Sequence, residues 1–102
     1  MVDVKSIEIT QKSFLGIHVH LPHYPLYIIM STKTILASDM LDIAYFDHVQ
    51  KPVAVILTNQ QQNFDALLEA PVIAMNARAE ALGVQRGMRG KEALMLCEKG
   101  KK

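Results

Sequence analysis

The sequence contains one cysteine, Cys97, and no tryptophan among its 102 residues. A single cysteine excludes an internal disulfide and favours a reducing compartment, so we expect a cytoplasmic protein. Neither positive nor negative charge predominates, because the formal net charge is +1. A dedicated nucleic-acid-binding domain usually carries a strongly basic face. The only basic cluster here is the terminal Lys99, Lys101 and Lys102, so we expect no nucleic-acid partner.

Long hydrophobic runs are absent as well. The longest are Leu26–Met30 and Val53–Leu57, whereas a membrane-spanning helix needs roughly 20 apolar residues. Charged residues at Asp3, Lys5 and Glu8 interrupt any apolar region near the start, which argues against a secretory signal. Half of the residues are hydrophobic, which is typical of a globular chain. We therefore expect no membrane association and one domain over residues 1–102.

Alternating apolar and polar residues predict strands in the first third of the chain. They favour strands at Val4–Thr10 and Phe14–Leu21, joined as an antiparallel hairpin. In the second strand, Leu15, Ile17, Val19 and Leu21 share one face, and Gly16, His18 and His20 share the other. Continuous apolarity over Leu26–Ser31 predicts an interior strand that is covered on both faces.

Helices are predicted from residue 38 onwards. Ser38 is a good N-cap for a helix reaching about Val49, between short strands at Ile35–Ala37 and Val53–Thr58. Three further helices are expected: Phe64–Glu69 after Asn63, one from Pro71 to Gly83, and Gly90–Glu98. This order predicts an α+β, two-layer domain in which a mixed, mostly antiparallel sheet packs against helices.

The histidines at His18, His20 and His23 are the candidate metal ligands. Two histidines two residues apart on a strand point the same way, and a third just beyond could complete a zinc site. The alternative is structural, with His18 and His20 on the polar face of an amphipathic strand and His23 in a turn. Nothing else in the sequence indicates a cofactor, and we expect none.

Carboxylates at Asp39 and Asp42 share a face near the start of one predicted helix. Asp42 is the candidate catalytic acid or base, because close carboxylates can perturb one another's pKa. The helix dipole alone also favours aspartate at these positions.

A glycine-punctuated segment links the last two predicted helices. Its candidate ligand-binding residues are Arg86, Gly87, Arg89, Gly90 and Lys91. A helix start with free N–H groups and nearby cations suits an anion such as phosphate or carboxylate. The same pattern also suits an ordinary corner between two helices with solvated cations, and the sequence leaves both interpretations open.

The segment Gly87-Met88-Arg89-Gly90-Lys91-Glu92-Ala93-Leu94 resembles the closing signature of the YunC-like family of small bacterial and archaeal proteins of unknown function. The resemblance extends backwards through Leu82-Gly83, Ala70-Pro71, Leu41-Asp42 and Leu21-Pro22, and it covers most of the chain. It implies a compact α/β domain and brings no established activity. The family pattern has no histidines that match the three here, and this chain has Ser38-Asp39 where family members often have Cys-Gly.

The leading hypothesis is a module that binds a small anionic ligand or regulates through it. Self-association through strand edges or an apolar helix face would make it a homo-oligomer. The first alternative is a metabolic enzyme acting on an anionic substrate, with Asp42 as acid or base and Arg89, Lys91 and the Gly90 amide holding the substrate. The second alternative is a structural or interaction protein.

Overall fold

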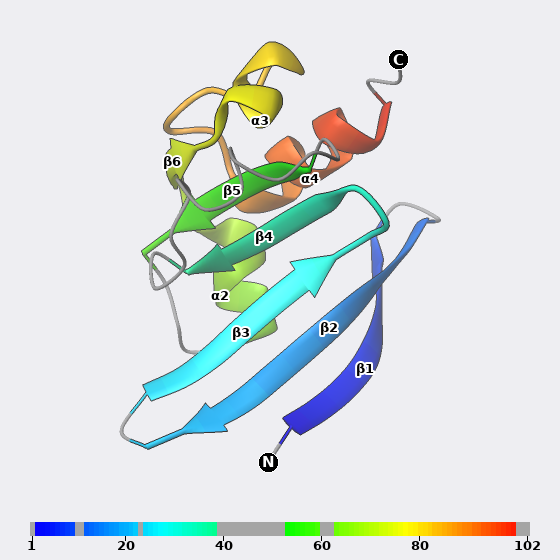
Figure 1. Cartoon of the computed structure of the whole chain (residues 1–102), viewed down its shortest axis with the longest axis vertical. Helices are drawn as coiled ribbons and strands as arrows, with labels where there is room; N and C mark the ends of the chain where they lie inside the picture. The colour runs from blue at the N-terminus through cyan, green and yellow to red at the C-terminus, as the bar shows by residue number, and fades with distance from the viewer. Residues whose placement is uncertain (1, 10–11, 23, 39–52, 60–62, 100–102) are drawn as a thin grey trace.

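One sheet forms the frame of the molecule. The computed structural model describes residues 2–9, 12–22, 24–38, 53–59 and 63–99. Within these ranges six strands lie in the order β1-β2-β3-β4-β5-β6 (Figure 1). Their bounds are Val2–Ile9 (β1), Lys12–Leu21 (β2), Tyr24–Met30 (β3), Thr34–Ser38 (β4), Ala54–Thr58 (β5) and Val72–Met75 (β6). Strands β4 and β5 pair in parallel and the other neighbours pair antiparallel, which confirms a mixed, mostly antiparallel sheet.

Helices cover one face of this sheet. The helices are α2 (Phe64–Glu69), α3 (Ala77–Ala81) and α4 (Gly90–Lys99), and Figure 1 shows α2 and α4 behind the strands. The core between the layers joins strand residues such as Leu36 and Ile56 to Leu67 of α2 and Leu94 of α4, all fully buried. The two-layer α+β architecture is therefore confirmed. No helix in the described ranges is long and apolar enough to cross a membrane.

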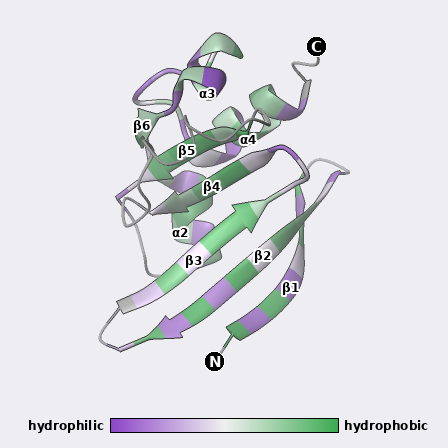
Figure 2. Cartoon of the chain, in the orientation of Figure 1, coloured by the Kyte–Doolittle hydropathy of each residue, from purple (hydrophilic) through white to green (hydrophobic). Residues whose placement is uncertain are grey.

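The first two strands form the predicted hairpin, with Val4 opposite Ile17 and Ile9 opposite Lys12. Along β2 the hydropathy alternates (Figure 2), and the helices cover the face that carries Gly16 and His18. Leu15 lies on the other face and is 43% exposed. Local packing explains why the face with Gly16 is the covered one. A Cβ on Gly16 would overlap Ile7 and lie 3.1 Å from Phe64, so the lack of a side chain at Gly16 makes room for both residues.

The prediction of a helix starting at Pro71 is wrong. Residues Val72–Met75 form β6, which pairs antiparallel with β5 and supplies the backbone partners that the edge of β5 requires. The helix starts later, at Ala77, because the Asn76 side chain accepts a hydrogen bond from the Ala79 N–H and caps it. Gly83 follows with a φ of 105°, which confirms it as the left-handed stop.

The remaining boundaries agree closely with expectation. Asn63 caps α2 by accepting from the Ala66 N–H, and α4 begins at Gly90. Strand β3 lies between β2 and β4, although among its described side chains only Ile29 is fully buried. The helix predicted from Ser38 to Val49 falls, apart from Ser38 itself, outside the described residues.

Candidate functional site

The segment Gly83–Lys91, which we call the glycine corner, connects α3 to α4. Backbone hydrogen bonds tie it to the preceding strand. The Gly87 N–H donates to the Val72 carbonyl at 3.0 Å, and the Val72 N–H donates to the Met88 carbonyl at 2.8 Å. The Gly87 backbone has a φ of 91°, a conformation that glycine adopts without steric cost. The corner is therefore a fixed part of the fold, in which many backbone groups already have partners.

Gly90 has an architectural role within this corner. Its N–H donates to the Ala70 carbonyl at 2.9 Å, so this amide is occupied rather than free for an anion. The residue is buried, and a Cβ at this position would overlap the Leu67 carbonyl oxygen and lie 3.3 Å from both methyl groups of Leu36. Glycine is needed here because the start of α4 approaches the end of α2 closely.

Arg89 and Lys91 both face a carboxylate of the protein. The Lys91 Nζ lies 2.9 Å from Glu69 Oε2, and the Arg89 guanidinium lies 3.7 Å from Glu69 Oε1. The hydrogen bond from Lys91 is the main reason that the pKa of Glu69 is lowered. These two cations therefore have an internal counter-charge, and α2 and the start of α4 share it. Sequence reasoning missed Glu69, which lies some twenty residues before its partners.

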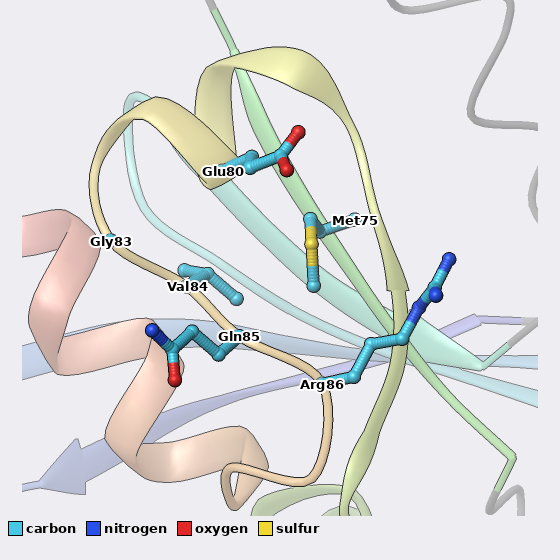
Figure 3. Close-up of a pocket in the computed structure, with 6 residues that line it drawn as sticks. All are labelled: Met75, Glu80, Gly83, Val84, Gln85 and Arg86. Atoms are coloured by element: carbon cyan, nitrogen blue, oxygen red, sulfur yellow. The ribbon is translucent and has the colours of Figure 1, made fainter.

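Arg86 has a different setting from the other predicted residues of the corner. It borders a cavity of about 480 Å³ between α3 and the turn that follows it. The lining residues, drawn in Figure 3, are Met75, Glu80, Gly83, Val84, Gln85 and Arg86. Gly87, Arg89, Gly90 and Lys91 are not among them. The structure thus divides the predicted anion site into a self-paired part and a part that faces a pocket.

Several polar groups that border this pocket lack partners inside the described ranges. The backbone N–H groups of Gln85 and Arg86 donate no hydrogen bond there, and the side chains of Arg86 and Glu80 form no ion pair there. Figure 3 shows the Arg86 and Glu80 side chains on different sides of the pocket, with the Met75 side chain between them. The site therefore offers a cation, an anion and an apolar floor.

The predicted histidines meet a carboxylate that sequence reasoning missed. His20 Nε2 lies 2.7 Å from Asp3 Oδ2, and His18 Nδ1 lies 3.9 Å from the same oxygen. The hydrogen bond with His20 is the main reason that the pKa of Asp3 is lowered. His23 lies outside the described residues. The signal that would have identified Asp3 is the register of the hairpin, which places it directly opposite His18.

The nucleophile and acid–base candidates do not assemble into a catalytic set among the described residues. Asp42 lies outside them, so its predicted approach to the corner stays a prediction. The buried Ser38 hydroxyl has no hydrogen-bond partner within the described ranges. Cys97 is fully buried, and burial raises the pKa of its thiol to about 11, which disfavours the nucleophilic thiolate.

Comparison with known proteins gives relatives without an assigned activity. The sequence profile described as "Domain of unknown function (DUF1805)" matches residues 40–96. The chain is 28% identical over 97 residues to "Uncharacterized protein YunC" of Bacillus subtilis (strain 168), covering 93% of this chain and 96% of that protein. The crystal structure of a protein of unknown function, TA1206 from Thermoplasma acidophilum, shares the fold with a TM-score of 0.84 at 21% identity, over 93% of this chain and 91% of that one. These findings confirm the resemblance to the YunC-like family.

Proposed function

We propose, for a chain that belongs to the family described as "Domain of unknown function (DUF1805)", that it binds a small zwitterionic molecule in the pocket beside Arg86. The observation that carries this proposal is the pair of opposite charges, Arg86 and Glu80, that line one cavity. The pocket residues all lie within the part of the chain that the family profile matches. A free amino acid is the simplest natural ligand of this class.

The anionic end of the ligand belongs at Arg86. The guanidinium can bind a carboxylate through two parallel hydrogen bonds. The N–H groups of Gln85 and Arg86 lie at the same turn and have no hydrogen-bond acceptor within the described ranges. A bound carboxylate would supply acceptors to both kinds of donor at once. Arg89 and Lys91 are weaker candidates for this role because Glu69 already pairs with them.

The cationic end belongs at Glu80. This residue lies on α3 and is exposed, and no basic side chain in the described ranges lies within ion-pair distance of its carboxylate. An anion with no positive group would meet repulsion from Glu80, so the pocket favours a molecule that carries both charges. Between the two ends, the partly buried Met75 side chain provides apolar surface for the body of the ligand.

The arginine that binds the ligand is identified by matched variants in isothermal titration calorimetry with free amino acids. Arg86→Gln is expected to weaken binding about tenfold or more, because a charge-assisted hydrogen bond contributes roughly 1.5–3 kcal/mol. Arg89→Gln is the matched control and should bind as the wild type does. Equal weakening by both variants would contradict the assignment of the pocket.

The role of Glu80 is resolved in the same titrations by changing the ligand. N-acetylated amino acids, which lack the ammonium group, should bind the wild-type protein more weakly than free amino acids. In Glu80→Gln this preference should vanish. If the wild-type protein binds N-acetylated and free amino acids equally, the pocket would still bind anions, but its preference for a zwitterionic ligand would be contradicted.

Self-association is the second part of the proposal, with a second copy of this chain at strand β1. This strand ends the sheet, and its Val2 and Val4 side chains are 54% and 59% exposed. A twofold antiparallel pairing centred on Val4 would place Asp3 of each copy opposite Lys5 of the other. This register puts no like charges opposite one another, and it extends the apolar face across both copies.

The dimer is tested by light scattering coupled to gel filtration. The wild-type chain should elute as a dimer, and Val4→Lys should give a monomer because two lysines would meet at the twofold axis. Ile73→Lys changes an exposed apolar residue of β6, at the far end of the sheet, and should remain dimeric. A monomeric wild-type protein at high concentration would remove this part of the proposal.

A further inference from the structure

A second site lies at the opposite end of the molecule from the α3 pocket, on the β1–β2 hairpin near the N-terminus (Figure 1). Three potential metal ligands meet there: Asp3 of β1, and His18 and His20 of β2. Their ligand atoms all lie within 4.8 Å of one another. The hairpin brings them together, because Asp3 is directly opposite His18 and side chains two residues apart on a strand share a face.

The spacing of these atoms fits one small metal ion. Zinc binds histidine nitrogen and carboxylate oxygen at about 2.0–2.2 Å, so neighbouring ligands of a tetrahedral site lie about 3.3 Å apart. The observed separations from Asp3 Oδ2 are 2.7 Å to His20 Nε2 and 3.9 Å to His18 Nδ1. These two distances bracket the tetrahedral value, so small rotations of exposed side chains would bring all three atoms into ligand positions.

The rings are also held in place before any ion binds. His18 stacks on Tyr27 with ring centroids 4.1 Å apart and planes 16° apart, and Tyr27 packs against Phe64 in a T-shaped arrangement. The His20 ring packs against the His18 ring, with the two centroids 4.0 Å apart. The His18 side chain is only 19% exposed, whereas Asp3 is 65% exposed. One ligand is thus fixed by packing, and the open side at Asp3 gives an ion access from solvent.

We infer that Asp3, His18 and His20 bind one divalent transition-metal ion of the zinc class. Imidazole nitrogen suits zinc, copper and nickel, whereas magnesium and calcium prefer oxygen ligands. Three protein ligands leave a coordination position open to water or to a small ligand. The site lies outside residues 40–96, so it is a property of this chain separate from the part that the family profile matches.

The test uses the full chain without an affinity tag, stripped of metal with a chelator and titrated with Zn²⁺ alone in a calorimeter. We expect one Zn²⁺ per chain and no saturable heat with Mg²⁺. His20→Ala and Asp3→Asn should each weaken Zn²⁺ binding at least about tenfold, since loss of even a supporting group around a metal costs 10–100-fold. Both residues are at least 43% exposed, so both variants should remain folded.

Glu8→Gln is the matched control, because it removes an exposed carboxylate from the same strand. It should bind Zn²⁺ as the wild type does. Co²⁺ provides a second readout, since the visible absorption of a four-coordinate ion should appear in the wild type and be lost in His20→Ala. The inference is overturned if the wild type shows no saturable Zn²⁺ binding, or if Asp3→Asn and His20→Ala bind Zn²⁺ as tightly as the wild type.

Discussion

Gly90→Ala should lower the free energy of unfolding by about 3 kcal/mol, the upper end of the usual cost of overpacking a buried position. The added methyl group would overlap the Leu67 carbonyl oxygen, which belongs to backbone and cannot rotate away as a side-chain tip can. It would also lie 3.3 Å from both Leu36 methyl groups. For a chain of this size the midpoint of thermal unfolding should fall by roughly 10–20 °C.

Gly87→Ala separates this steric effect from the backbone preference of glycine. Gly87 has a φ of 91°, but a Cβ there would meet nothing within 4 Å. The substitution should therefore cost only about 1–2 kcal/mol, the penalty of a left-handed conformation for a residue with a side chain. Calorimetric or denaturant unfolding of both variants gives the comparison. Equal stability losses would show that Gly90 does not make the close contact with α2.

Asn76→Ala should cost about 3–4 kcal/mol, because one side chain serves three backbone groups. Its Oδ1 accepts from the N–H groups of Val55 and Ala79, both at 3.0 Å, and its Nδ2 donates to the Val53 carbonyl at 2.7 Å. Asn76 is 3% exposed, so water cannot easily replace these bonds. Each buried group left without a partner costs about 1–3 kcal/mol.

The control for Asn76 is Asn63→Ala, which changes the same residue type in the same capping role. Asn63 is exposed and, among the described residues, accepts one hydrogen bond, from the Ala66 N–H at 2.7 Å. Its loss should cost about 1 kcal/mol, the usual value for an N-cap. Denaturant unfolding measures both. A loss in Asn76→Ala no larger than in Asn63→Ala would contradict the account of Asn76 as the link between β5 and α3.

The sequence predicts those features of the fold that depend on local chemistry. Alternation identified the hairpin, Asn63 identified the start of α2, and Gly83 identified the left-handed stop after α3. The strand Val72–Met75 was missed because helical spacing of Val72 and Met75 is also compatible with a strand, and only the unpaired edge of β5 decides between them. That edge is a tertiary feature, which no local pattern contains.

The candidate sites were predictable only in part, for the same reason. The sequence grouped Arg86 with Arg89 and Lys91 because they are neighbours in the chain. In the fold, Glu69 of α2 pairs with Arg89 and Lys91. Arg86 instead shares a pocket with Glu80 of α3. On the hairpin, the carboxylate that contacts His18 and His20 is Asp3, which lies fifteen positions before His18 and is found only through the strand register.

The most direct test of the central claim, that the pocket beside Arg86 is the binding site, is an NMR titration. Backbone amide signals of the full chain would be followed while pools of free amino acids are added. The account predicts that the Gln85 and Arg86 amides, which have no acceptor in the described structure, shift with a saturating dependence on one ligand. The Gly90 amide, already bonded to Ala70, should change little. Saturating shifts centred on Gly90 and Lys91, or no shift at Gln85 and Arg86 with any pool, would contradict it.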